Sequence, residues 1–170
     1  DTSLTEDEYL EVIRCKTAVL FQGACRTGAL VAGADDGRVE RLSGFGYHLG
    51  IAFQMADDLL DYTQDLTALG KRAGADLREG KMTLPLIHAL SKASAADRRV
   101  MLATLGNPNF SDGAFADLVE MLNAYGGIDY TRAQAAAHIQ TAKTQLGAFD
   151  DRSTRDLLTD IADYALVRSA

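Results

Sequence analysis

Apolar residues recur along almost the whole chain at spacings of three and four. This is the period of an α-helix rather than of a β-strand. Glycine-, asparagine- and proline-rich turn signals separate the helical stretches. The predicted helices cover, in order, residues 6–34, 38–65, 84–91, 95–105, 113–125, 128–146 and 156–168. The sequence therefore predicts an all-α helical bundle.

The first predicted helix has a well-marked start. Thr5 and Glu8 have the spacing of a capping box, in which each side chain accepts a hydrogen bond from the other residue's backbone amide. Lys16 and Thr17 follow directly before an apolar run. The pattern alone allows a lysine that extends along the surface and a threonine bonded back to its own helix. It equally allows a pair of functional residues.

The helix predicted over residues 38–65 has one apolar and one acidic face. Its apolar positions are Ile51, Ala52, Met55, Ala56, Leu59 and Tyr62. At about 100° per residue, the other face carries Gln54 and the carboxylates Asp57, Asp58 and Asp61. Carboxylates beside a core are costly unless a cation neutralises them, and Mg²⁺ favours one or two carboxylates together with substrate phosphates. The alternative is a solvated acidic face, which is the common case for a short acidic motif.

Two lysines follow the acidic face at short range. Lys71 stands in a Gly-Lys pair, and Lys81 stands in the sequence Gly-Lys-Met-Thr-Leu-Pro that ends at Pro85. Lysines beside a metal-competent face are suited to a polyanion held through metal ions. Residues 66–82 are rich in glycine and mixed charges, which is typical of a mobile surface loop. Pro85 is expected in the first turn of the next helix.

Composition and charge narrow the possible partners and compartment. The chain has 170 residues with a net charge of −7, which argues against a general attraction to nucleic acid or anionic lipid. No apolar run is long enough for a membrane span, and no signal peptide is recognisable, so we expect a cytoplasmic protein. Cys15 and Cys25, ten residues apart in one helix, are too distant to bridge; we expect both to be small core residues.

Two other patterns look like ligand sites but lack the necessary spacing. Residues Asp150 to Asp156 contain widely spaced aspartates after a turn, and we expect a loop followed by a helix N-cap. His48 has no second histidine at a metal-ligand spacing, so we expect a packing or surface residue.

The acidic face and the segments after it together resemble a known family. Gln54, the Asp57–Asp61 box, Gly70-Lys71 and the segment Gly80–Pro85 resemble the second aspartate-rich region of the trans-isoprenyl diphosphate synthases, the polyprenyl synthetase family. The order and spacing are most similar to those of the long-chain octaprenyl- and decaprenyl-type members. The stretch from Tyr9 to Phe21 resembles the Lys-Thr helix of the same family.

The resemblance implies a magnesium-dependent prenyltransferase of isoprenoid and quinone side-chain biosynthesis. Such an enzyme joins isopentenyl diphosphate to an allylic prenyl diphosphate head to tail, by way of an allylic cation. The implied roles are metal ligands for Asp57, Asp58 and Asp61, diphosphate binding for Lys71 and Lys81, and catalysis for Lys16, Thr17 and Gln54. Of the catalytic residues, Lys16 would contact the allylic diphosphate, and the uncharged Thr17 and Gln54 would stabilise the cation.

The family also implies a larger molecule. Its members normally have about twice this length, form homodimers, and carry a first aspartate-rich motif in an N-terminal half that is not recognisable here. Residues 1–170 are therefore expected to be a single all-helical region, the C-terminal half of a synthase domain, inactive alone. A non-catalytic helical partner subunit of a prenyl synthase remains an alternative. A terpene cyclase relative is a third, which the Lys16-Thr17 and Gly80–Pro85 matches disfavour.

Overall fold

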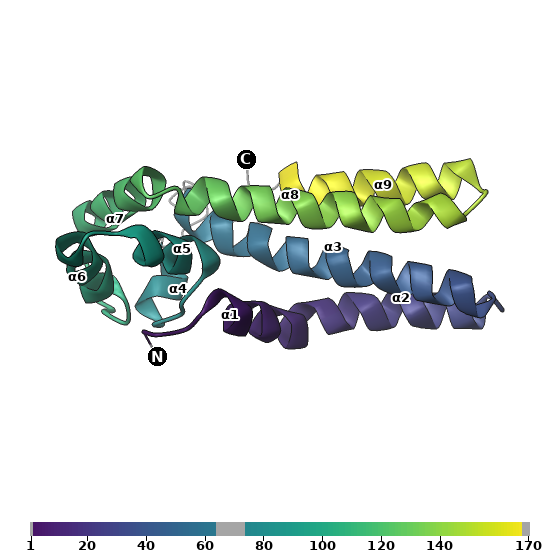
Figure 1. Ribbon diagram of the computed structural model, residues 1–170, viewed down its shortest axis with the longest axis horizontal. Coiled ribbons are helices and arrows are strands. Elements are labelled where there is room, and N and C mark those ends of the chain that lie inside the picture. Colours follow the sequence, from purple (N-terminus) through teal and green to yellow (C-terminus); the bar gives the residue numbers. More distant parts are fainter. Residues whose placement is uncertain (1, 64–73, 168–170) are drawn as a thin grey trace. The chain divides into compact units, whose positions relative to one another are not determined.

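The computed structural model describes residues 2–63 and 74–167, and all its regular elements are helical (Figure 1). The α-helices are α1 (Glu6–Ile13), α2 (Val19–Val31), α3 (Asp36–Thr63), α4 (Ala75–Arg78), α5 (Leu84–Lys92), α6 (Ala95–Thr104), α7 (Asp112–Ala124), α8 (Gly127–Gln145) and α9 (Arg152–Val167). A π-helical turn, Arg14–Ala18, joins α1 to α2, and a 3₁₀ turn, Leu146–Ala148, follows α8. The all-α prediction is confirmed. Within the described ranges, no helix has the length and apolar character needed to cross a membrane.

The chain divides into two compact units. Unit 1 comprises Asp1–Tyr9 and Asp57–Arg132, and unit 2 comprises Leu10–Ala56 and Ala133–Ala170. Helices α1, α3 and α8 contribute residues to both units. Each unit is described by itself below.

Unit 1 contains the end of α3 and the helices α5, α6 and α7. Helices α5, α6 and α7 pack against one another. Its fully buried side chains include Leu59, Leu77, Leu84, Leu86, Met101, Leu118 and Leu122. Pro85 lies in the first turn of α5, as predicted. A Cβ at Gly127 would lie 2.2 Å from the carbonyl oxygen of Pro85. The start of α8 can therefore approach α5 this closely only because residue 127 is a glycine. The predicted capping box is also confirmed: the Thr5 amide donates to Glu8 at 2.8 Å, and the Glu8 amide donates to Thr5 at 3.3 Å.

In unit 2, the predicted continuous helix over residues 6–34 contains a π-helical turn. The amide of Val19 donates to the carbonyl of Arg14, five residues back. The turn lets both Ile13 and Ala18 reach the core, with exposed fractions of 3% and 0%. In an α-helix, residues five apart would lie about 140° apart around the axis. The wider π turn removes most of this difference, and it contains Lys16 and Thr17.

The same turn leaves one predicted core residue in solvent. Cys15 is exposed, and its thiol contacts the carboxylate of Glu11 at 3.4 Å, whereas Cys25 is half-buried. The expectation of two core cysteines is therefore wrong for Cys15. Cys15 lies within the π turn, where the rotation per residue is smaller than in an α-helix, so an α-helical pattern misplaces its side chain.

Helix α3 packs on the π turn and α2 through its own glycines. A Cβ at Gly46 would lie 2.5 Å from the carbonyl oxygen of Phe21, and a Cβ at Gly50 would lie 2.6 Å from the Cα of Ala18. Both distances are far below van der Waals contact. The two backbones can therefore approach only because these positions lack a side chain.

A histidine pair joins α3 to α8 in unit 2. Nδ1 of His48 lies 2.9 Å from Nδ1 of His138, which is 90 residues away in sequence. Burial lowers the pKa of His48. Burial, and to a lesser degree the neighbouring His48, lowers the pKa of His138 to about 4. The sequence predicted a packing or surface histidine at position 48, and a contact with a residue 90 positions away has no short spacing that could indicate it.

Replacing Gly50 by alanine should lower the free energy of unfolding by about 1–3 kcal/mol, because the new methyl group forces α3 away from Ala18. Gly28 provides the matched control. It is helical, and no atom lies within 4 Å of a Cβ there, so Gly28→Ala should raise the stability by about 0.5–1 kcal/mol. Urea denaturation of both variants measures the difference. Equal stabilisation by the two alanines would contradict the close packing at Gly50.

The histidine pair predicts a loss of stability in acid. Because the pKa of His138 is about 4 when folded and about 6.5 when unfolded, the unfolded chain binds more protons between these values. The melting temperature should therefore fall as the pH is lowered from 6.5 to 4. In His138→Gln the fall should be smaller, since glutamine does not titrate. Parallel falls in the two proteins, measured by circular dichroism, would remove the histidine contribution.

Candidate active site

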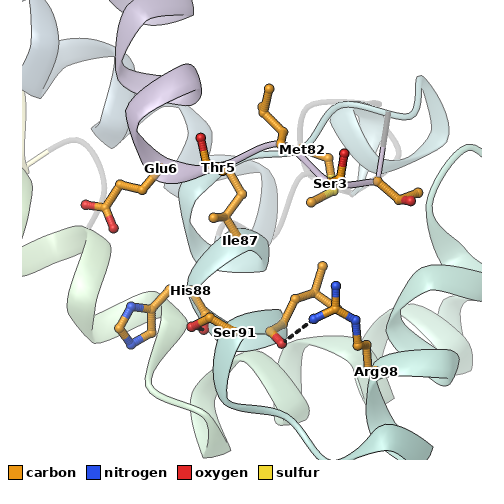
Figure 2. Close-up of a pocket in the computed structure, with 11 residues that line it drawn as sticks. Ser3, Thr5, Glu6, Met82, Ile87, His88, Ser91 and Arg98 are labelled. Atoms are coloured by element: carbon orange, nitrogen blue, oxygen red, sulfur yellow. Dashed lines mark hydrogen bonds between the residues drawn. The ribbon is translucent and has the colours of Figure 1, made fainter.

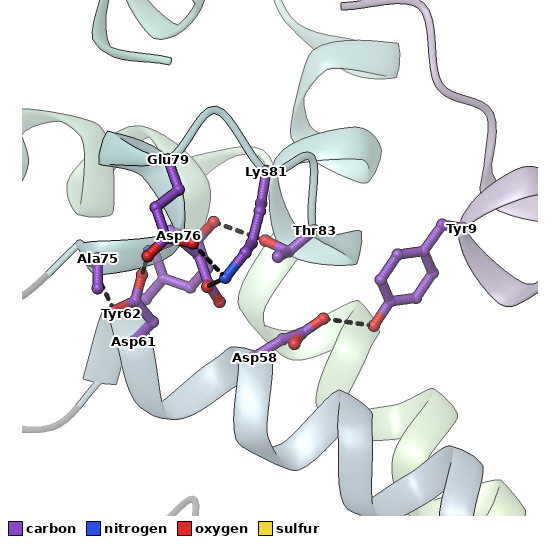
Figure 3. A network of polar contacts seen from close by, with 9 residues as sticks. All are labelled: Tyr9, Asp58, Asp61, Tyr62, Ala75, Asp76, Glu79, Lys81 and Thr83. Carbon is purple, nitrogen blue, oxygen red and sulfur yellow. Dashed lines mark hydrogen bonds and ion pairs between the residues drawn. The ribbon is translucent and has the colours of Figure 1, made fainter. Parts of the chain in front are cut away.

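The three predicted metal ligands on α3 have different environments in unit 1. Asp57 is exposed, and none of the described residues forms a hydrogen bond or an ion pair with its carboxylate. Asp58 is 6% exposed and accepts a hydrogen bond from the hydroxyl of Tyr9 at 2.7 Å (Figure 3). Asp61 is 9% exposed and accepts the backbone amides of Ala75 at 2.9 Å and Asp76 at 3.0 Å. One carboxylate is thus open, and two are held in place.

Asp61 organises the segment that follows α3. Its carboxylate accepts the first two amides of α4, whose hydrogen-bonding groups have no partner within that helix. Gly74, with φ at +76°, allows the chain to enter this short helix. Burial raises the pKa of Asp61, and the two amides partly oppose the increase. Helix α4 is only four residues long, too short to show a hydrophobic period in the sequence. The prediction of a loop over residues 66–82 is therefore wrong at Ala75–Arg78.

Lys81 is folded back onto α4. Its ammonium contacts the carboxylates of Asp76 and Glu79, each at 2.7 Å (Figure 3). These hydrogen bonds raise the pKa of Lys81, so the side chain is charged. The side chain is 48% exposed, and an ammonium has three donors. Lys81 is therefore a solvent-accessible cation. It pairs with Asp76, whose backbone amide donates to Asp61.

Little in the sequence indicates three members of this network. Asp76 lies in the segment predicted as a loop, although its spacing of five from Lys81 suits a turn-closing ion pair. Tyr9 is 49 residues from Asp58, and no local pattern could have joined them. Tyr62 was assigned only to the apolar face. Its buried hydroxyl in fact shares a 2.6 Å hydrogen bond with that of Thr83.

In unit 2, two of the predicted catalytic residues are brought together. The hydroxyl of Thr17 donates to Oε1 of Gln54 at 2.7 Å, across 37 residues of sequence. Gln54 is 4% exposed and Thr17 is half-buried. The threonine is therefore bonded to α3 and not back to its own helix. Lys16, in the same π turn, is exposed, and no described residue forms an ion pair with it.

The predicted site residues fall into separately described groups. Lys16, Thr17 and Gln54 belong to unit 2, and Asp57, Asp58, Asp61 and Lys81 belong to unit 1. Lys71 lies outside the described residues.

The described pocket is elsewhere in unit 1 (Figure 2). Its volume is about 320 Å³, and it lies between residues 2–6, α5 and α6. Arg98 lines it and donates to the carbonyl of Leu90 at 2.9 Å. None of the predicted site residues that the structure describes lines this pocket, so we do not assign the predicted chemistry to it.

A metal ion fits the acidic end of α3 only with help from a ligand. No group of three histidine, cysteine, aspartate or glutamate side chains in the described part of the chain is arranged to hold one. Asp57 is open, and Asp61, one turn later, has lone pairs beyond those that accept its two amides. Mg²⁺ is typically held by one or two carboxylates, by phosphate oxygens and by water. The residues fit this arrangement and not a cage made of protein ligands alone.

Known proteins similar to this chain are prenyl synthases. The polyprenyl synthetase family profile matches residues 1–122. The chain is 38% identical over 165 residues to a short chain isoprenyl diphosphate synthase of Methanothermobacter thermautotrophicus, covering 97% of this chain and 50% of that protein. It is 35% identical over 168 residues to octaprenyl diphosphate synthase of Escherichia coli, covering 99% and 52%.

A solved structure has the same fold. The chain superposes on the polyprenyl synthase of Caulobacter crescentus CB15, complexed with calcium and isoprenyl diphosphate, with a TM-score of 0.91 and 38% identity, covering 100% of this chain and 52% of that one. The chain thus spans about half the length of the relatives it matches, and the matched part is their C-terminal half. The predicted resemblance is confirmed: the chain belongs to the polyprenyl synthetase family.

Proposed function

We propose that this chain supplies the C-terminal half of a polyprenyl diphosphate synthase. The complete enzyme would join isopentenyl diphosphate to an allylic prenyl diphosphate, head to tail. The observation that carries the proposal is the open carboxylate of Asp57, one turn before the network of Asp61, Asp76 and Lys81, in a chain of this family. Because the relatives include both a short chain and an octaprenyl synthase, the similarity supports a reaction class and not a product length.

In this proposal the acidic end of α3 holds Mg²⁺ against the allylic diphosphate. Asp57 would be the foremost ligand, with Asp61 and Asp58 as ligands or as acceptors for metal-bound water. The bound ion supplies positive charge that makes the diphosphate a better leaving group. The calcium and isoprenyl diphosphate found with the Caulobacter relative support a divalent cation in this role. Tyr9 and the amides of α4 hold Asp58 and Asp61, so these carboxylates lose little freedom on binding.

Lys81 would add positive charge from the protein itself. Asp76 and Glu79 keep its ammonium charged and in place, while its remaining donor is available to a diphosphate oxygen. Lys16, which is exposed in the π turn, is proposed to contact an allylic diphosphate on the basis of the resemblance. Lys71 is proposed as a further diphosphate ligand on the basis of the resemblance alone.

Thr17 and Gln54 would act on the cation that forms when the diphosphate leaves. Since the hydroxyl proton of Thr17 is donated to Gln54, the lone pairs of the threonine oxygen point away from that bond. Gln54 thereby orients the negative end of the hydroxyl dipole, and a fixed dipole stabilises a developing positive charge without reorganising. We propose that the complete enzyme is a homodimer, as is usual in the family.

Asp57→Asn should lower prenyl transfer by about a hundredfold or more, because an amide cannot neutralise a metal ion, and even indirect partners of metal sites contribute on this scale. The assay uses the polypeptide as its source organism produces it, with isopentenyl and allylic diphosphates and Mg²⁺. Asp36→Asn is the matched control: Asp36 is exposed at the other end of α3, and its variant should retain full activity. Activity of Asp57→Asn within twofold of the wild type would contradict the proposal, as would a wild type without prenyl transfer.

Lys81→Gln should raise the KM for the allylic diphosphate by about tenfold or more, since a hydrogen bond to a charged group contributes about 1.5–3 kcal/mol. The melting temperature should change little, because the lysine is half-exposed and its ion pairs are weakly stabilising. Lys92→Gln, an exposed lysine at the end of α5, should leave the KM unchanged. A fall in melting temperature with an unchanged KM would make Lys81 a structural residue.

A further inference from the structure

The histidine pair of unit 2 has a geometry that the proposed synthase chemistry does not use. His48 projects from α3 and His138 from α8, with Nδ1 atoms 2.9 Å apart. Their ring centroids are 5.1 Å apart, and the ring planes are inclined by 41°. The centroid separation is close to that of two rings whose Nδ1 atoms point at each other. The two Nδ1 atoms therefore face each other along the line that joins the rings.

Two neutral imidazoles in this arrangement share one proton. One Nδ1 donates, and the other must accept, because a neutral histidine has one donor and one acceptor nitrogen. Both rings are half-buried, and their lowered pKa values keep them uncharged near neutral pH. Neutral imidazole is the form that binds metals, so metal binding here would not have to displace protons from charged rings.

We propose that His48 and His138 form a two-imidazole binding site for a transition-metal dication of the Ni²⁺, Cu²⁺ or Zn²⁺ class. With metal–nitrogen bonds of about 2.05 Å, two ligand nitrogens are about 2.9 Å apart at a 90° angle and about 3.3 Å apart at the tetrahedral angle. The observed 2.9 Å lies at the start of this range. Because the two nitrogens point at each other, each ring would turn by about 35–45° to direct its lone pair at the ion. The shared proton moves from Nδ1 to Nε2 of the same ring, so both rings stay neutral and both Nδ1 atoms can bind the ion.

The ligand set determines which cations the site selects. Imidazole nitrogens favour the later transition metals, whereas Mg²⁺ prefers oxygen. Within the described ranges no carboxylate or thiol completes a three-ligand group, so water would fill the remaining positions. The half-buried rings leave room for it. This site is thus chemically different from the oxygen-rich end of α3.

A bound ion would also hold α3 to α8 within unit 2. The two histidines are 90 residues apart in sequence, so the unfolded chain rarely presents them together. A ligand that binds the folded state better than the unfolded state raises the melting temperature. Metal binding and thermal stability are therefore two independent measurements of the same site.

The test is calorimetric titration of Ni²⁺ into the metal-free, tag-free protein, in a non-coordinating buffer at pH 7.5. A Cys15→Ser background removes the exposed thiol as a competing ligand. We expect one Ni²⁺ per chain, and at least a tenfold loss of affinity in both His48→Ala and His138→Ala. Ni²⁺ should raise the melting temperature of the parent protein, EDTA should reverse the rise, and Mg²⁺ at the same concentration should not reproduce it.

The third histidine of the chain supplies the matched control. His88 stacks on Tyr130 in unit 1, with ring centroids 3.9 Å apart, and His88→Ala should leave Ni²⁺ affinity unchanged. Circular dichroism and the melting temperature without metal show whether each variant is folded; His48→Gln and His138→Gln replace an alanine variant that is not. Affinity that survives loss of both paired histidines, equal losses in His88→Ala, or no binding by the parent protein would each overturn the proposal.

Discussion

The burial of one face of α3 is the constraint on which the described structure depends. Ile51, Ala52, Met55, Ala56 and Leu59 are each at most 1% exposed, so the orientation of the helix is fixed by the hydrophobic effect. That orientation decides where the polar residues between them point. Asp58 and Asp61 are consequently drawn into low-exposure positions, where a carboxylate without partners would be costly. Tyr9 and the amides of α4 supply the partners that make this burial tolerable.

Most of the helices were predictable because they follow from the local periodicity of apolar residues. The apolar positions of α3, the Thr5 capping box and the Pro85 helix start follow from spacings of a few residues, and the structure agrees with them. The amide of Ser153 likewise donates to Asp151 at 3.2 Å, so a helix start and not a ligand cluster lies here, although α9 begins at Arg152 and not at residue 156 as predicted.

The features that could not be predicted are those made through space. The Tyr9–Asp58 and His48–His138 contacts join residues 49 and 90 positions apart, and no short motif encodes them. Helix α4 is too short to have a measurable period. The π turn has one indication in the sequence, because Ile13 and Ala18 are apolar at a spacing of five. A single spacing of five among spacings of three and four is not enough to distinguish a π turn from a regular α-helix.

The π turn also constrains how this region of the chain can change length. Four residues separate Ile13 from Ala18, one more than an α-helical repeat of the same face requires. Losing one of the four would leave Ile13 and Ala18 four residues apart, a spacing at which a regular α-helix keeps both side chains on one face. Gaining one would place them six residues apart, about 120° around a regular helix, and would turn one of the two side chains toward solvent. The core therefore tolerates a shortening at this point better than a lengthening, but a shortening would change the direction in which Thr17 points toward Gln54.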